Sequence, residues 1–213
     1  MPSAPNTLQA SYSLTVLPGI DLSRAVAACR RAVSGAGIAA ARGEAVAVLD
    51  GGLAAWQQAG LPLESGAAQP VSPRHFELHE SGVHWLSTAE VAAHLGKGPV
   101  IIDARARPRY LGETEPLDPV AGHIPGALNR PFNLNLQSNG LFKPAQVLRA
   151  EFEALLNGQT PDSVIHQCGS GISAIPNLLA MEVAGLGRAR LYPGSWSEWC
   201  NTPGMPCEKS PSV

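Results

Sequence analysis

The residues in this sequence that most clearly indicate chemistry are a cysteine and the glycines that follow it. An apolar strand pattern over residues 164–166 leads into Cys168-Gly169-Ser170-Gly171-Ile172-Ser173-Ala174. Open α/β sheets bind ligands beyond the carboxyl ends of their strands, so we expect Cys168 at a ligand-binding edge. The N–H groups of a tight loop and the start of the next helix would lower the pKa of the thiol and stabilise the reactive thiolate. Gly169 and Gly171 are expected to supply positive φ angles.

Several classes of enzyme place a functional loop after a strand in this way, and each class requires particular residues near the position of Cys168. A cysteine phosphatase needs an arginine six positions after the cysteine to bind the phosphate dianion, and position 174 is alanine. A P-loop needs a lysine at the start of the helix, and this loop has none. A cysteine hydrolase needs a histidine base within reach. His166, His123 and His94 are compatible with that role without favouring it. A buried, inert cysteine is the alternative that glycines at a strand end make less favourable.

Strand and helix patterns alternate over the second half of the chain. Strands are predicted at 83–86, 99–103, 163–166 and 189–192, and helices at 87–96, 144–158, 173–184 and 195–199. Ser87 and Glu90 have the spacing of a capping box at the start of the first helix. Residues 105–139, rich in glycine, proline and glutamate, are expected to form a long loop. The alternation predicts an α/β fold with a largely parallel sheet flanked by helices.

The first third of the chain gives weaker signals. Residues 1–43 are rich in alanine, and only a short helix around Leu22, Val26 and Cys29 is suggested there. Residues 45–49 predict a strand and residues 53–60 a helix that glycine and proline end. Residues 64–74 have the composition of a linker.

Composition limits the classes of partner. The 213 residues carry a net charge of −2, which offers no field for nucleic acid or an anionic membrane. The chain has no apolar run of about 18 residues and no secretory signal over its first 20 residues, so we expect a cytoplasmic protein. Its four cysteines form no C-x-x-C pair, and Cys200 and Cys207 are expected to be ordinary loop thiols. No metal or cofactor is expected.

Together, several motifs resemble those of the rhodanese and 3-mercaptopyruvate sulfurtransferase family, in the family's order. They are the Cys168–Ala174 loop, Asp103-Ala104-Arg105, Arg109-Tyr110, Gly122-His123-Ile124-Pro125-Gly126-Ala127 and Tyr192-Pro193-Gly194-Ser195-Trp196-Ser197-Glu198-Trp199. The resemblance implies a rhodanese-like fold with a catalytic domain over residues 75–207, preceded by a linker at 67–74. The segment from Asp50 to Trp56 resembles the end of a first, non-catalytic rhodanese domain. It implies a partial second rhodanese-like unit over residues 1–66, in which 1–43 match nothing.

The resemblance also implies roles for individual residues. Cys168 would be the nucleophile that carries a persulfide, and Ser170 would assist proton transfer. Arg109 would bind an anionic sulfur donor, since a guanidinium offers paired donors to a carboxylate or thiosulfonate. His123 and Asp103 would be structural. The backbone N–H groups that would hold the outer sulfur belong to Gly169, Ser170, Gly171, Ile172, Ser173 and Ala174.

Two departures from the family pattern leave alternatives open. The stretch Glu115-Pro116-Leu117-Asp118-Pro119 lacks the second arginine usual in mercaptopyruvate enzymes, and Gly169 and Ser170 lack the charge usual in thiosulfate enzymes. The donor is therefore mercaptopyruvate or thiosulfate, and the acceptor cyanide, a thiol or a thioredoxin-like reductant. The first domain is also shorter than the family's, so the alternative function is a catalytically weak rhodanese-like binding module.

Overall fold

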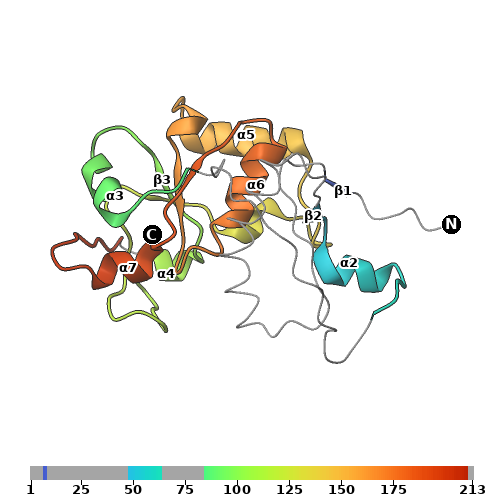
Figure 1. The fold of residues 1–213 in the computed structure, drawn as a ribbon, viewed down its shortest axis with the longest axis horizontal. Helices are drawn as coiled ribbons and strands as arrows, with labels where there is room; N and C mark the ends of the chain where they lie inside the picture. The colour runs from blue at the N-terminus through green and yellow to red at the C-terminus, as the bar shows by residue number, and fades with distance from the viewer. Residues whose placement is uncertain (1–6, 9–47, 64–83, 211–213) are drawn as a thin grey trace, which may run out of the picture. The chain divides into compact units, whose positions relative to one another are not determined.

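The structure, a computed structural model, describes residues 7–8, 48–63 and 84–210. The chain divides into two compact units: Met1–Val83 with Ser138–Phe142, and His84–Gln137 with Lys143–Val213. The second unit contains the Cys168 loop and Arg109. Figure 1 labels helices and strands of both units.

This larger unit is built on a parallel sheet of four strands in the order β4-β3-β5-β6. The strands are β3 (Ile101–Asp103), β4 (Leu128–Asn129), β5 (Ile165–Gln167) and β6 (Arg190–Leu191). All residues of the two central strands β3 and β5 are buried, as expected when helices cover both faces. The predicted strand at 83–86 is reduced, in its described part, to a parallel bridge between Trp85 and Leu191. The predicted α/β fold with a parallel sheet and flanking helices is confirmed.

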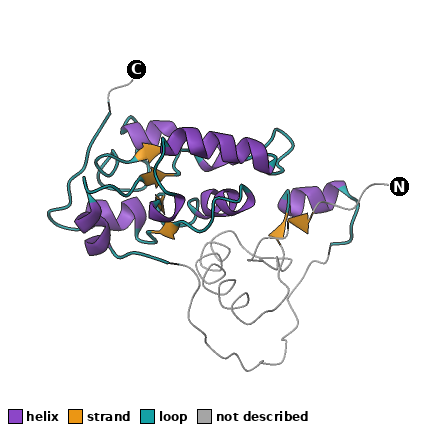
Figure 2. Ribbon diagram, turned by 90° about the horizontal axis from the view of Figure 1, so that it is seen from above, coloured by secondary structure: helices purple, strands orange, loops and turns teal. Residues whose placement is uncertain are grey.

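Helices pack against both faces of the sheet (Figure 2). On one face lie α5 (Ala145–Leu156) and α6 (Ile175–Val183), whose Phe152 and Met181 contact His166 of β5. On the other face lie α3 (Thr88–His94) and α7 (Ser195–Asn201). A short 3₁₀ turn, η2 (Pro161–Ser163), precedes β5.

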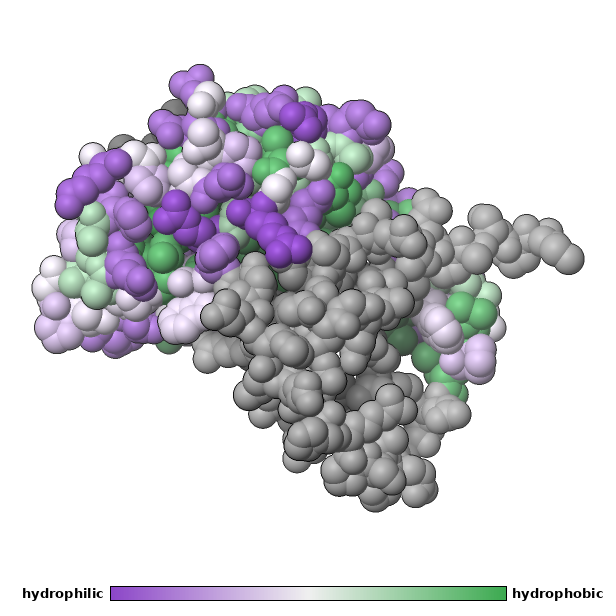
Figure 3. Space-filling model, turned by 45° about the horizontal axis from the view of Figure 1, so that its top comes forward, coloured by the Kyte–Doolittle hydropathy of each residue, from purple (hydrophilic) through white to green (hydrophobic). Residues whose placement is uncertain are grey.

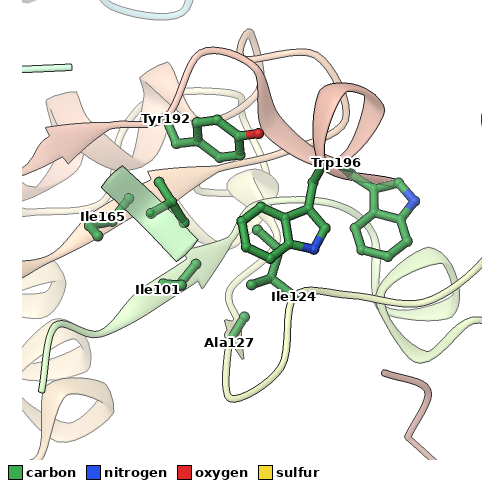
Figure 4. Close-up of a cluster of buried hydrophobic side chains, with 8 residues drawn as sticks. Ile101, Ile124, Ala127, Ile165, Tyr192 and Trp196 are labelled. Carbon is green, nitrogen blue, oxygen red and sulfur yellow. The ribbon is translucent and has the colours of Figure 1, made fainter. Parts of the chain in front are cut away.

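The core between the sheet and helices α3 and α7 is a cluster of apolar side chains (Figure 4). Its buried members are Val91, Ile101, Ile124, Ala127, Ile165, Tyr192, Trp196 and Trp199. The indole N–H groups of Trp196 and Trp199 donate to the carbonyl oxygens of Val120 and Pro206, at 2.9 and 2.8 Å. Both large aromatic residues are therefore buried without leaving a donor unpaired, and they fix α7 against the sheet.

Two helix boundaries follow from local sequence as predicted. The side chain of Ser87 accepts from the N–H of Glu90 and the Glu90 carboxylate accepts from the N–H of Ser87, which completes the capping box at α3. Helix α5 buries Leu148, Phe152 and Leu156 on one face and ends at Leu156, followed by Asn157, which is left-handed with φ 47°.

The prediction of a continuous loop over residues 105–139 is wrong. This segment contains α4 (Arg107–Leu111), strand β4 and the 3₁₀ helix η1 (Phe132–Asn135). Helix α4 has Pro108 in its first turn and left-handed Gly112 at its end, which are ordinary start and stop signals. Five residues are too few to show a helical period, and β4 is held by parallel pairing with β3 rather than by its own propensity.

In the smaller unit, β1 (Thr7–Leu8) pairs antiparallel with β2 (Val48–Leu49), and α2 (Gly52–Gln58) follows. The strand and helix predicted at 45–49 and 53–60 are thus present in their described parts. Strand β1 corrects the expectation that residues 1–43 hold little beyond a short helix. That helix, around Cys29, and the linker at 67–74 lie outside the described residues, and the partial rhodanese-like unit stays a prediction.

The visible face of the larger unit is mainly hydrophilic, with apolar side chains in small groups (Figure 3). Within residues 7–8, 48–63 and 84–210, no helix is both long and apolar enough to cross a membrane.

Candidate functional site

Cys168 comes directly after β5, at the carboxyl edge of the sheet, and its side chain is buried, with 2% of the residue exposed. The N-terminal end of α7 fixes its backbone. The N–H of Cys168 donates to Ser195 Oγ at 3.1 Å, and its carbonyl oxygen accepts from the N–H of Trp196 at 3.0 Å. The carbonyl oxygen of Gly169 accepts from the N–H of Ser197 at 2.9 Å. Ser195 holds a left-handed conformation, with φ 55°, to make this contact.

The two glycines of the loop serve different purposes. Gly171 has φ +83°, and a Cβ there would lie 2.5 Å from the carbonyl oxygen of Pro193, so both its conformation and its surroundings require glycine. The φ of Gly169 is not positive, which corrects the prediction for that residue. A Cβ at Gly169 would instead lie 3.3 Å from Nη1 of Arg109. Glycine at 169 therefore allows a guanidinium to approach the loop closely.

The loop after Cys168 holds backbone N–H groups without acceptors in the described protein. Those of Gly169, Gly171, Ile172, Ser173 and Ala174 donate no hydrogen bond to another described residue. Ser170 is half-buried, like Ile172 and Ser173, and Ala174 is buried just before α6. Unpaired N–H groups in a turn are the donors with which proteins bind anions.

Arg109, on α4, is the cation that the fold places beside this loop. Its Nη2 donates to Glu115 Oε1 at 2.6 Å and to Asp118 Oδ2 at 3.3 Å, and its Nε donates to Glu115 Oε2 at 3.3 Å. Its Nη1, the nitrogen nearest Gly169, makes no hydrogen bond with another described residue. The guanidinium is thus held by two carboxylates on one side and is available to a ligand on the other.

Glu115 links this arginine to a second one. It accepts from Nη1 of Arg105 at 3.3 Å and from the N–H groups of Leu117 and Asp118 at 3.2 and 3.3 Å. Burial acts to raise the pKa of Glu115, but the hydrogen bonds from Arg109 and from these N–H groups lower it below its ordinary value. Glu115 is therefore a carboxylate at neutral pH.

Arg105 is fully engaged within the protein. Its guanidinium donates to both oxygens of Asp103 and to the carbonyl oxygen of Gly122, and it lies 4.8 Å from the centre of the Trp196 ring. With 2% of its side chain exposed, Arg105 has a structural role.

The histidines considered as bases differ in their surroundings. His166 is fully buried, and burial lowers its pKa to about 3, so it is a neutral core residue. His123 is stacked on Tyr110, and its Nδ1 lies 2.7 Å from the carbonyl oxygen of Tyr110. Its backbone pairs with Glu208, which fits the structural role predicted for it. His94 lies in the last turn of α3.

Two other thiols are described, and both are free. Burial raises the pKa of the Cys200 and Cys207 thiols, which makes them weaker nucleophiles at neutral pH. Among the residues with described positions, no three metal-ligating side chains gather into a cluster.

Residues 87–202 match the family described as the rhodanese-like domain. The chain belongs to that family. It is 46% identical over 164 residues to a probable 3-mercaptopyruvate sulfurtransferase from Pseudomonas aeruginosa, with 76% of this chain and 57% of that protein aligned. It is 40% identical over 168 residues to a putative thiosulfate sulfurtransferase from Mycobacterium tuberculosis, aligning 76% of this chain and 56% of that protein.

A solved structure of a protein with a similar name also has a similar fold. The 3-mercaptopyruvate sulfurtransferase from Leishmania major superposes with a TM-score of 0.66 at 27% identity, covering 83% of this chain and 49% of that one. The chain therefore spans about half the length of the relatives that it matches.

The rhodanese domain brings together most of the residues predicted for the site. Arg109 and the Cys168 loop, far apart in the sequence, meet at Gly169. Sequence reasoning missed the acidic partners of Arg109 and the support of Cys168 by Ser195. The motif from Tyr192 to Trp199 included Ser195. The absence of an arginine between Glu115 and Asp118 indicated that this stretch differs from that of mercaptopyruvate enzymes. Neither signal revealed the contact.

Proposed function

We propose that this rhodanese domain transfers sulfane sulfur from a small anionic donor to a thiophilic acceptor through a persulfide on Cys168. The observation that carries the proposal is the meeting of Arg109 Nη1 with the Cys168 loop at Gly169, where the N–H groups of Gly169, Gly171 and residues 172–174 make no hydrogen bond to another described residue. A cation and several N–H donors beside one thiol suit an anion that brings sulfur to that thiol.

In the first half-reaction, the Cys168 thiolate attacks the sulfane sulfur of the donor. A new S–S bond forms as the C–S bond of 3-mercaptopyruvate breaks, and the released enolate of pyruvate takes up a proton. With thiosulfate, the S–S bond of the donor breaks and sulfite leaves. Arg109 would bind the carboxylate or the sulfonate oxygens, and the unpaired N–H groups of the loop would stabilise the terminal persulfide sulfur. Ser170 would pass the proton to the leaving group.

In the second half-reaction, the acceptor attacks the terminal sulfur and the Cys168 thiolate is the leaving group. Cyanide gives thiocyanate, and a thiol gives a new persulfide that a second thiol reduces. We include a thioredoxin-like reductant among the acceptors because dithiols perform this second step by exchange. The described cysteines are free thiols, as in a reducing compartment, and we propose the cytoplasm as the location.

The experiment is a donor assay with 3-mercaptopyruvate and thiosulfate side by side, using cyanide as the acceptor and measuring thiocyanate. The Cys168→Ser variant should lose transfer from both donors, because a hydroxyl forms no persulfide. Its urea unfolding should match that of the wild type, because the change is nearly isosteric. Cys200→Ser is the matched control and should keep full activity. Transfer that survives in Cys168→Ser would contradict the proposal, and a wild type inactive with both donors would favour a binding module.

A further inference from the structure

The carboxylates beside Arg109 affect which sulfur donor the site accepts. Two guanidinium groups, Arg105 and Arg109, lie in one network with three carboxylates, those of Asp103, Glu115 and Asp118. The side chains of Glu115 and Asp118 are only 4% and 7% exposed, so their charges act more strongly on a nearby ligand than charges at an open surface would. The network as a whole therefore carries no excess positive charge beside the Cys168 loop.

The geometry also limits how Arg109 can bind an anion. Its Nε and Nη2 are occupied by Glu115 and Asp118, which leaves Nη1 toward Gly169. A guanidinium that offers one free nitrogen makes a single-edge contact with an anion rather than a paired contact through Nε and Nη2. It can satisfy one negative charge of a donor, but a second charge would lie near the two carboxylates.

The two carboxylates differ in what they hold. Glu115 bonds to both arginines and to two backbone N–H groups, so it fixes the loop as well as the guanidinium. Within the described part of the chain, the side chain of Asp118 makes one hydrogen bond, in which its Oδ2 accepts from Arg109 Nη2 at 3.3 Å. Its contribution to the site is therefore mainly its charge. The amide oxygen of an asparagine could accept the same hydrogen bond.

We propose that Asp118, with Glu115, makes the donor site selective for monoanionic over dianionic sulfur donors. This inference rests on the proposed function. Mercaptopyruvate carries one carboxylate, and its thiol stays largely protonated at neutral pH, since an ordinary thiol has a pKa of about 8.5. Thiosulfate carries two negative charges. Asp118 opposes the second charge and is a specificity-determining residue.

The test compares kcat/KM for thiosulfate and for mercaptopyruvate in the wild type and in Asp118→Asn, with cyanide as the common acceptor. The ratio of thiosulfate to mercaptopyruvate should rise about tenfold in Asp118→Asn, the size of one unit charge acting in a partly shielded site. Glu113→Gln, which removes the same charge from an exposed position of the same segment, should leave the ratio unchanged. An unchanged ratio in Asp118→Asn, or an equal loss with both donors, would overturn the inference.

The wild type provides a second measurement that depends on no variant. Salt screens repulsion between the carboxylates and a dianion, so the same ratio should rise with ionic strength. A ratio that falls with salt would show that the site attracts the second charge, which would also overturn the inference. If the wild type transfers sulfur from neither donor, the proposed function itself fails, whereas transfer with an unaltered ratio removes only the role of Asp118.

Discussion

The loop after Cys168 and the segment from Arg105 to Asp118 follow neighbouring parallel strands and meet at one edge of the sheet. They differ in how far the protein satisfies their polar groups. Among the described residues, the loop keeps several N–H groups without acceptors, whereas the segment pairs the guanidinium groups of Arg105 and Arg109 with carboxylates. The difference separates two functions: the unsatisfied loop is suited to hold a reacting sulfur, and the compensated segment is suited to position and select the donor.

The largest effect on stability is expected from substitution of Arg105, the guanidinium most fully paired with carboxylates. Arg105→Ala would leave the carboxylates of Asp103 and Glu115 buried without their shared partner, which should cost about 3–5 kcal/mol in the free energy of unfolding. Urea unfolding followed by tryptophan fluorescence measures this. Arg107→Ala, an exposed change two residues further along the chain, at the start of α4, is the control and should cost little. Equal costs for both variants would show that the Arg105 network contributes nothing to the fold.

Arg109→Ala should instead alter the kinetics. Loss of its contact to the anion should raise KM for the donor by about 10- to 150-fold, since a hydrogen bond from a charged group is worth about 1.5–3 kcal/mol. The reaction of the preformed persulfide with cyanide should change less. Arg107→Ala again serves as the matched control. Donor kinetics that stay the same in Arg109→Ala would remove this arginine from the donor site. The segment from Arg105 to Asp118 would then contribute to the fold and not to donor binding.

The smallest expected effect is the pH dependence of stability that comes from His166. This residue lies two positions before Cys168 but belongs to the core, so the effect tests whether His166 is part of the site. Burial lowers its pKa from 6.5 to about 3. Below pH 6.5 the unfolded chain binds a proton there that the folded chain binds only near pH 3. Stability should therefore fall as the pH drops across this window, by up to about 1.4 kcal/mol per pH unit from this group.

His166→Leu removes the titrating group, so the fall in unfolding free energy between pH 6 and pH 5 should be shallower than in the wild type. Urea unfolding at the two pH values measures it. Persulfide formation should persist in the variant, because burial lowers the pKa of His166 to about 3 and so makes its imidazole too weak a base to take a proton from a thiol. An unchanged slope together with lost persulfide formation would place His166 in the site.

Local sequence predicted those parts of the domain whose structure is decided locally. The capping box of Ser87 and Glu90 and the buried face of Leu148, Phe152 and Leu156 appear in the structure as expected. The parts that were missed depend on tertiary contacts. Strand β4 has two residues and exists because β3 pairs with it.

The same distinction applies to the site. Cys168 and Arg109 could be predicted as site residues because each lies in a short motif of consecutive residues. The pairing of Arg109 with Glu115 and Asp118 depends on how the segment after α4 turns back, and no spacing rule for helices or strands predicts it. The sequence showed only that these positions hold carboxylates where an arginine was expected.

The residue that carries the transferred sulfur, proposed to be Cys168, can be identified directly. Wild-type protein is incubated with mercaptopyruvate or thiosulfate without an acceptor, and its intact mass and its proteolytic peptides are then measured. A persulfide on Cys168 predicts the addition of one sulfur atom, located on the peptide that contains Cys168 and removed by cyanide. Added sulfur on Cys200 or Cys207, with none on Cys168, would contradict it.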